Sequence, residues 1–334
     1  MKLTEIYTAL EHFTKVNLPV FIWGPPGIGK SSVVKKIAKD QALEFIDLRL
    51  SLLDPTDLKG IPFFDKEKSQ AVWASPNFLP QDSTSKGILF LDEINTAAPS
   101  VQASAYQLVL DRKVGDYTLP DGWSIVAAGN RENDRGVTYR MPPPLANRFV
   151  HLEMEVDFED WKQWAHSNAI DPSIIGFLMF DKEKLFDFDT TKNEKSFPTP
   201  RSWEYVDKIL KSNLDEKLLS ESISGAVGKE SSIAYMSFSK VMHRLPDIEK
   251  ILNAEISTLV EEDSRVLFTL CAGLVNALKV SNTKNHLENV LTFSHQLPSE
   301  FTIMLVKDLQ QNGINVESAN AWDTWVRKYS YLLS

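Results

Sequence analysis

The stretch Gly24-Pro-Pro-Gly-Ile-Gly-Lys-Ser31 directly follows the apolar run Val20-Phe21-Ile22-Trp23. It matches every fixed position of the phosphate-binding pattern G-x-x-x-x-G-K-[ST], which joins a strand to a helix. Glycines let the backbone turn so that its N–H groups point at phosphate oxygens, and the following helix adds its positive dipole end. We therefore expect a nucleoside triphosphate to bind here; an ordinary glycine turn is the alternative. The residues expected to hold it are Gly24, Pro25, Pro26, Gly27, Ile28, Gly29, Lys30, Ser31 and Ser32.

The chemistry expected of this loop depends on two of its side chains and on a second stretch. Lys30 would reach the β- and γ-phosphates, and the Ser31 hydroxyl would take one position on Mg²⁺. The stretch Gly87-Ile-Leu-Phe-Leu-Asp-Glu93 is an apolar run that ends in two carboxylates, at the edge where α/β sheets bind ligands. We expect Asp92 to hold the Mg²⁺ shell and Glu93 to polarise the attacking water. A strand that ends in a capped turn is the alternative.

A third polar residue follows another predicted buried strand. The run Ser124–Ala128 ends at Gly129 and Asn130. If this strand neighbours the one that ends at Asp92, Asn130 would lie beside Glu93. Its amide could then hold the attacking water, whereas an Asx turn at a strand end is the alternative.

Composition indicates a globular protein with room for two domains. The chain has 334 residues, of which 43% are hydrophobic and 24% charged. No apolar run approaches the roughly 18 residues that span a bilayer, and the first residues do not resemble a secretion signal. The single cysteine, Cys271, lies in an apolar helical stretch and is expected in the core. We therefore expect a cytoplasmic protein.

Strand and helix patterns divide the chain into two parts. Alternating strands and helices over residues 1–155 predict an α/β domain whose parallel sheet is covered by helices. Residues 156–334 carry helical patterns. Residues 151–334 carry the whole net charge of −9, which disfavours a broad nucleic-acid surface there. No histidine or cysteine cluster has the spacing of a metal site. Helices are expected at Phe158–Ser167, Ser173–Phe180, Pro200–Leu210, Glu216–Val227, Asp247–Leu252, Arg265–Val280 and Ser299–Gln310.

With these motifs in this order, the chain resembles an AAA+ ATPase and, more narrowly, the MoxR branch. Leu53-Asp-Pro-Thr-Asp-Leu-Lys-Gly60 is similar to that branch's insertion before Walker B, and Asp92-Glu-Ile-Asn-Thr-Ala-Ala-Pro99 is similar to its stretch after it. Lys113–Trp123 looks like the hairpin before the sensor strand. The resemblance covers roughly residues 16–215. Ala128-Gly-Asn-Arg131 differs from the family's usual sequence Gln-Asn-Pro. The resemblance does not extend to the chain beyond Val227.

The resemblance implies a role for each motif. Walker A falls at Gly24–Ser31, Walker B at Asp92 and Glu93, and sensor 1 at Asn130. It also implies a helical lid, ATP and Mg²⁺ as cofactors, and hydrolysis of ATP to ADP and phosphate. The protein would form a homo-oligomeric ring, expected to be a hexamer, that remodels a protein client in a chaperone-like way. A partner with a von Willebrand factor A domain is implied as well.

Two arginines gain roles by the same resemblance. Arg148 would be the arginine finger that reaches a neighbouring subunit's nucleotide, with Arg135 and Arg140 as alternative fingers. An intradomain salt bridge is the other interpretation of Arg148. Arg201 would be sensor 2 on the lid, or else a surface charge at the start of a helix.

Two excursions from the predicted core carry aromatic residues. Leu53–Phe64 and Lys113–Trp123 contain side chains suited to gripping a polypeptide, or to packing on their own hairpins: Phe63, Phe64, Tyr117 and Trp123. Three functions therefore compete. The first is a ring ATPase that remodels a protein, the second a nucleic-acid motor or clamp-loading ATPase, and the third a small-molecule kinase. The absence of a basic domain disfavours the second, and contact with nucleic acid or a membrane is not expected.

Overall fold

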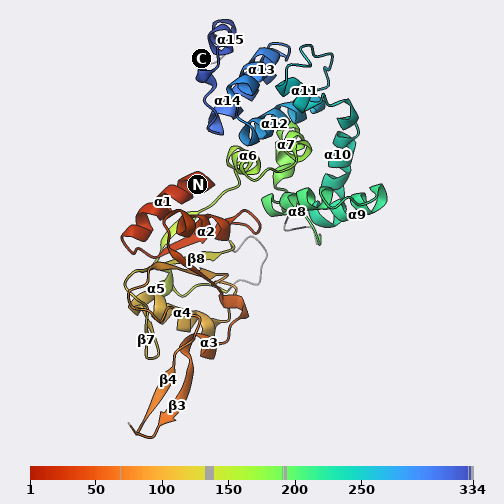
Figure 1. Cartoon of the computed structure of the whole chain (residues 1–334). Coiled ribbons are helices and arrows are strands. Elements are labelled where there is room, and N and C mark those ends of the chain that lie inside the picture. The colour runs from red at the N-terminus through yellow and green to blue at the C-terminus, as the bar shows by residue number, and fades with distance from the viewer. Residues whose placement is uncertain (68, 132–138, 190, 192–193, 330, 332–334) are drawn as a thin grey trace. The chain divides into compact units, whose positions relative to one another are not determined.

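The computed structural model describes residues 1–67, 69–131, 139–189, 191, 194–329 and 331 (Figure 1). The chain forms two compact units, Met1–Asp157 and Phe158–Ser334, each with its own hydrophobic core. Each unit is described by itself below.

The first unit is built on a sheet of five parallel strands in the order β2-β5-β8-β1-β9. The strands are β1 (Val20–Trp23), β2 (Glu44–Arg49), β5 (Gly87–Asp92), β8 (Trp123–Gly129) and β9 (Val150–Glu153). The three central strands are continuous apolar runs and almost completely buried, as is typical of parallel strands covered on both faces. The predicted α/β fold, a parallel sheet covered by helices, is confirmed.

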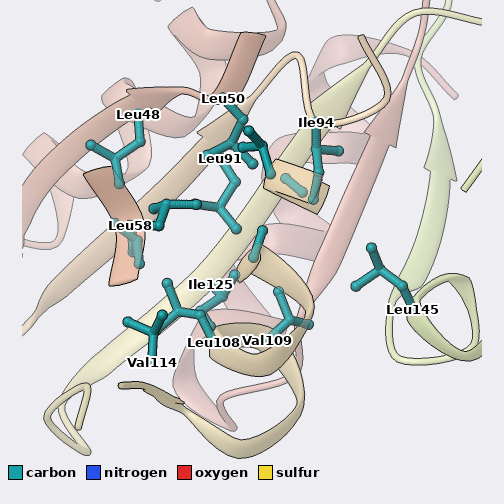
Figure 2. Close-up of a cluster of buried hydrophobic side chains, with 14 of the residues drawn as sticks. Leu48, Leu50, Leu58, Leu91, Ile94, Leu108, Val109, Val114, Ile125 and Leu145 are labelled. Atoms are coloured by element: carbon teal, nitrogen blue, oxygen red, sulfur yellow. The ribbon is translucent and has the colours of Figure 1, made fainter. Parts of the chain in front are cut away.

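Helices cover both faces of this sheet. Figure 1 shows α1 (Leu3–Lys15) and α2 (Lys30–Asp40) on one side, and α3 (Pro55–Lys59) and α4 (Pro99–Asp111) on the other. A one-turn helix, α5 (Pro143–Ala146), precedes β9. Figure 2 shows the core beneath α3 and α4, where aliphatic side chains from the sheet and the helices interdigitate. The members labelled there are Leu48, Leu50, Leu58, Leu91, Ile94, Leu108, Val109, Val114, Ile125 and Leu145.

Two small hairpins leave the sheet. The first pairs β3 (Ile61–Asp65) with β4 (Gln70–Ala74), and its side chains Ile61, Phe63 and Phe64 are exposed. The second pairs β6 (Lys113–Val114) with β7 (Tyr117–Thr118). Figure 1 shows the first hairpin projecting from the body of the unit.

Of the two interpretations given for Tyr117 and Trp123, inward packing is confirmed and availability to grip a polypeptide is not. Both belong to the hydrophobic core, and Trp123 is completely buried at the start of β8. The Tyr117 hydroxyl donates to the carbonyl of Pro80 at 2.8 Å, and the indole N–H of Trp123 donates to Ser85 Oγ at 2.9 Å. Both rings therefore pack inside the first unit, where their polar atoms have hydrogen-bond partners.

The described residues of the second unit form helices and loops, with no strand among them. Its helices are α6 (Phe158–Ser167), α7 (Pro172–Phe180), α8 (Pro200–Leu210), α9 (Glu216–Val227), α10 (Lys229–Ser239), α11 (Ile248–Leu252), α12 (Ser264–Val280), α13 (Lys284–Ser294), α14 (Ser299–Gln311) and α15 (Ala321–Tyr329). Short 3-10 turns lie at Lys182–Leu185, Met242–Arg244 and Val316–Ser318. Helix α12 is central, because it packs against α7, α14 and α6. Cys271 is completely buried in it, as expected.

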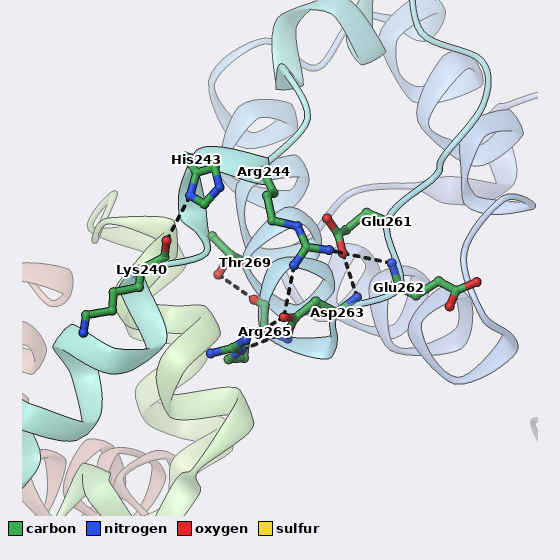
Figure 3. A network of polar contacts seen from close by, with 8 residues as sticks. All are labelled: Lys240, His243, Arg244, Glu261, Glu262, Asp263, Arg265 and Thr269. Carbon is green, nitrogen blue, oxygen red and sulfur yellow. Dashed lines mark hydrogen bonds and ion pairs between the residues drawn. The ribbon is translucent and has the colours of Figure 1, made fainter.

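A polar network fixes the start of α12 to the preceding chain (Figure 3). Asp263 caps the helix by accepting from the backbone N–H of Arg265 at 3.0 Å. Its carboxylate also pairs with the Arg265 side chain at 2.7 Å. Arg244 reaches Glu261 at 2.6 Å, and so joins the turn Met242–Arg244 to the same segment. These exposed ion pairs add little stability, but they define the path of the loop.

No helix in the described part of the chain is both long and apolar enough to cross a membrane.

Candidate nucleotide-binding site

The loop Gly24–Ser31 connects β1 to α2 at the carboxyl edge of the sheet. Gly27 and Gly29 have φ angles of 79° and 101°, which side chains rarely tolerate. The first turn of α2 carries no acidic residue and its N-cap, Gly29, offers no side-chain acceptor. The positive end of the helix is thus left for an anion, as in phosphate-binding loops.

The side chain of Lys30 turns back over this loop. Its ammonium donates to the carbonyl oxygens of Gly24 at 2.6 Å and Pro25 at 2.9 Å. It also donates to Asn130 Oδ1 at 3.0 Å, and so joins the loop to the end of β8. Ser31 and Ser32, which follow on α2, are half-buried and exposed, respectively. The positive charge is therefore held at the mouth of the loop.

Asp92 ends β5 in surroundings that disfavour its charge. Burial raises the pKa of the Asp92 carboxyl, and the carboxylate of Asp47 on β2 raises this pKa further. The backbone N–H of Glu93, 3.0 Å from Asp92 Oδ1, and the charge of Lys30 lower the pKa in part. A cation beside Asp92 would relieve this penalty, so the residue fits a metal-binding role.

Glu93 occupies the left-handed region of the backbone, with φ of 56°. Such a conformation is uncommon for residues with a side chain and is found at turns and functional sites. Its carbonyl accepts hydrogen bonds from the backbone N–H and the hydroxyl of Thr96. Its carboxylate accepts a hydrogen bond from the Ser51 hydroxyl, in the 3-10 turn Leu50–Leu52 after β2.

The strand order confirms the neighbour relation from which the position of Asn130 was predicted. Strand β8 lies between β5, which ends at Asp92, and β1, which leads into the loop. The Asn130 side chain is directed to Lys30, and its backbone carbonyl accepts a hydrogen bond from Asn95. Lys30, Asp92, Glu93 and Asn130 thus gather at one edge of the sheet.

The arginines lie elsewhere. Arg148 follows α5 and is exposed. Its backbone N–H donates to the carbonyl of Leu145 at 3.1 Å, but its guanidinium makes no hydrogen bond or ion pair with any described residue. Arg140 is exposed too, and Arg135 lies outside the described residues. Arg201 is an exposed residue in the first turn of α8, in the second unit. The role assigned to each arginine stays a prediction.

Sequence reasoning missed three polar side chains that border this edge. Asp47 and Ser51 come from β2 and the turn after it, and Asn95 from the turn after Glu93. Ser51 and Asp47 match no motif, and only the pairing of β2 with β5 brings them to the site. Asn95 is the fourth residue of the quoted stretch Asp92–Pro99, so the motif contained it, but no role was assigned to its side chain.

A strand, a glycine loop and a helix, with two carboxylates at the end of a neighbouring strand, define a P-loop nucleotide-binding domain. Residues 20–156 match the family described as "ATPase family associated with various cellular activities (AAA)". This part of the chain is similar to that family and has the fold of an AAA P-loop NTPase domain. A curated relative, the Lon protease of Fervidobacterium nodosum, is 29% identical over 196 residues, which make up 54% of this chain and 23% of that protein. The chain thus spans about a quarter of that relative's length.

Solved structures with similar folds have low identity to this chain. A Cytophaga hutchinsonii protein, proposed to be an ATPase, is 16% identical, with a TM-score of 0.36, over 92% of this chain and 80% of that chain. The Holliday junction branch migration motor RuvB of Thermotoga maritima is 18% identical, with a TM-score of 0.38, over 81% of this chain and 79% of that chain. Scores this low carry no argument about function.

Proposed function

We propose that the protein is a MoxR-type AAA+ ATPase that hydrolyses ATP to ADP and phosphate. The observation that carries the proposal is the convergence of the glycine loop, Lys30, Asn130 and the pair Asp92–Glu93 at one sheet edge. These are the parts that phosphoryl transfer to water requires: a phosphate cradle, a cation, metal ligands and a base.

Each side chain has a defined task in this proposal. Ser31 and Asp92 would hold Mg²⁺, which supplies charge neutralisation at the phosphates. Lys30 would exchange its contacts with the loop carbonyls for phosphate oxygens. Glu93 would take the proton of the attacking water, and its unusual backbone conformation, supported by Thr96, keeps the carboxylate at the site. Asn130 would orient that water.

We further propose that hydrolysis is completed in a homo-oligomeric ring, a hexamer by the family resemblance. Arg148 supports this assembly, because its exposed guanidinium has no partner among the described residues and can reach a neighbouring subunit. Arg201 supports a lid role. It lies in the first turn of α8, where the helix dipole disfavours a positive charge, and an approaching anion would offset this repulsion.

The ring would act on a protein client together with a partner that carries a von Willebrand factor A domain. The exposed hairpin β3–β4 supports such a contact, because Ile61, Phe63 and Phe64 present apolar surface there. We propose a cytoplasmic location on the basis of the composition alone.

Nucleotide affinity measured beside turnover tests the proposal. Lys30→Ala should lose nucleotide binding, because it removes the charge that meets the phosphates. Glu93→Gln should keep nucleotide binding and lose turnover, because an amide cannot accept the proton. Lys39→Ala, at the exposed far end of α2, is the matched control and should behave as wild type.

Two results would contradict the proposal. Turnover of Glu93→Gln at the wild-type rate would remove Glu93 from the reaction. Phosphate transfer to a small molecule, without release of inorganic phosphate, would identify a kinase instead.

A further inference from the structure

Asn95 is a buried polar residue to which the proposed reaction gives no task. Only 2% of its surface is exposed, and it lies in the turn that leads from Glu93 to α4. Its side-chain amide donates to the backbone carbonyl of Asn130 at 2.7 Å. Its backbone carbonyl accepts from the backbone N–H of Tyr139 at 2.7 Å, whereas its side-chain oxygen Oδ1 is buried without a hydrogen-bond partner among the described residues. A buried residue that is bonded through both its side-chain amide and its backbone is constrained in position.

The hydrogen bond from Asn95 is one of several that connect the end of β8 to the catalytic edge. The backbone N–H of Ile94 donates to the carbonyl of Ala128 at 3.3 Å. This hydrogen bond joins the same turn to β8 two residues before Asn130. From the other side, Lys30 donates to the Asn130 amide oxygen at 3.0 Å. Asn130 is therefore held by its backbone from the Glu93 turn and by its side chain from the phosphate loop.

Close packing makes this arrangement specific for asparagine. A Cβ atom at Gly129 would lie 2.3 Å from Asn95 Oδ1, so the absence of a side chain at this position provides the room for the Asn95 amide. An aspartate at position 95 would have nearly the same shape. It would, however, place a carboxylate oxygen against the Asn130 carbonyl, where the amide now donates a hydrogen bond.

We propose that Asn95 is a positioning residue that fixes the separation between Glu93 and Asn130. The inference rests on the proposed function, in which these two residues act on one water molecule. Asn95 itself touches neither water nor nucleotide in this scheme. It acts through the Asn130 backbone, so its loss should disturb the geometry of hydrolysis more than nucleotide binding.

The alternative is that Asn95 only stabilises the fold, and a matched variant separates the two cases. Gln102 in α4 is also buried, and its amide donates to the Ala97 carbonyl at 3.0 Å. Asn95→Asp and Gln102→Glu make the same chemical change in the same unit. Both should lower the thermal midpoint, because each turns a buried hydrogen bond into a repulsion.

The test measures kcat, the ATP dissociation constant and the thermal midpoint in the full-length protein. We expect Asn95→Asp to lower kcat about tenfold or more while the dissociation constant stays within about threefold of wild type. Gln102→Glu should leave kcat close to wild type. Gly129→Ala, which displaces the Asn95 amide without removing it, should lower kcat in the same way and serves if Asn95→Asp does not fold.

The outcomes are distinct. Equal loss of kcat in Asn95→Asp and Gln102→Glu, or wild-type kcat in both Asn95→Asp and Gly129→Ala, overturns the positioning role alone. Parallel loss of affinity and turnover also overturns it, because Asn95 would then shape the binding loop. Absence of ATP hydrolysis in the wild-type protein overturns the proposed function, and the inference with it.

Discussion

The carboxyl group of Asp92 has a raised pKa, with burial as the main cause. In the unfolded chain the same group ionises at its ordinary pKa, so the folded protein binds the proton more tightly. Stability without nucleotide therefore falls as pH rises from that ordinary value through the raised one. This loss of stability is complete at pH values above the raised pKa.

Asp92→Asn should remove this penalty. Without nucleotide, the thermal midpoint of the variant should exceed that of wild type at pH 7, and the difference should vanish at pH values below the ordinary aspartate pKa. The increase in midpoint that Mg²⁺ and ATP give the wild type should be lost, because a metal ligand is missing. Thermal unfolding over a pH series, with and without Mg²⁺-ATP, measures both. A retained nucleotide-induced increase would contradict the metal role.

The residues of the loop and the pair Asp92–Glu93 could be predicted from sequence because each motif is continuous along the chain. Their gathering at one edge needed only the rule that parallel strands expose their carboxyl ends together. The contact of Ser51 with Glu93 could not be predicted from the sequence, because it depends on β2 being the neighbour of β5. Strand order is a property of the packed sheet and leaves no local signal.

For the β6–β7 hairpin as well, the sequence predicted the local structure but not how its side chains pack. The family resemblance of Lys113–Trp123 predicted the hairpin, but it did not show which way its aromatic rings face. The Tyr117 hydroxyl is buried, and desolvation raises the pKa of this phenol to about 12. In the second unit, α10 was missed because it is serine-rich and follows α9 after the single residue Gly228.

Substitution of an aromatic residue should have different effects in the two hairpins. Tyr117→Phe keeps the ring and removes the hydrogen bond to Pro80, so we expect unfolding to become easier by about 1 kcal/mol. Phe64→Ser removes an exposed ring and should leave stability close to wild type, but weaken client-stimulated hydrolysis. Denaturant unfolding and hydrolysis with and without client measure these effects. Full client stimulation in a Phe63→Ser, Phe64→Ser double variant would exclude the hairpin as the contact surface.

For the assembled protein, the decisive question is whether Arg148 acts on a neighbouring subunit. Arg148→Ala should bind ATP and fail to hydrolyse it, as should Glu93→Gln, so each variant alone is inactive. In mixed rings, some interfaces combine an intact Glu93 with an intact Arg148 from the next subunit, and activity should reappear. Light scattering with ATP confirms that rings form. If mixed rings stay inactive at every ratio, Arg148 is a structural residue.

Cys271 has a consequence for measuring motion in this protein. It is the only cysteine of the chain, it is completely buried, and burial raises the pKa of its thiol. Thiol-reactive dyes attack the thiolate, so they should leave the native protein unlabelled at neutral pH. Cysteines introduced at exposed Lys39 in one unit and exposed Lys217 in the other could then carry a fluorophore pair without removal of the native residue. Energy transfer between the dyes would follow the distance between the two units through a cycle of ATP binding, hydrolysis and release.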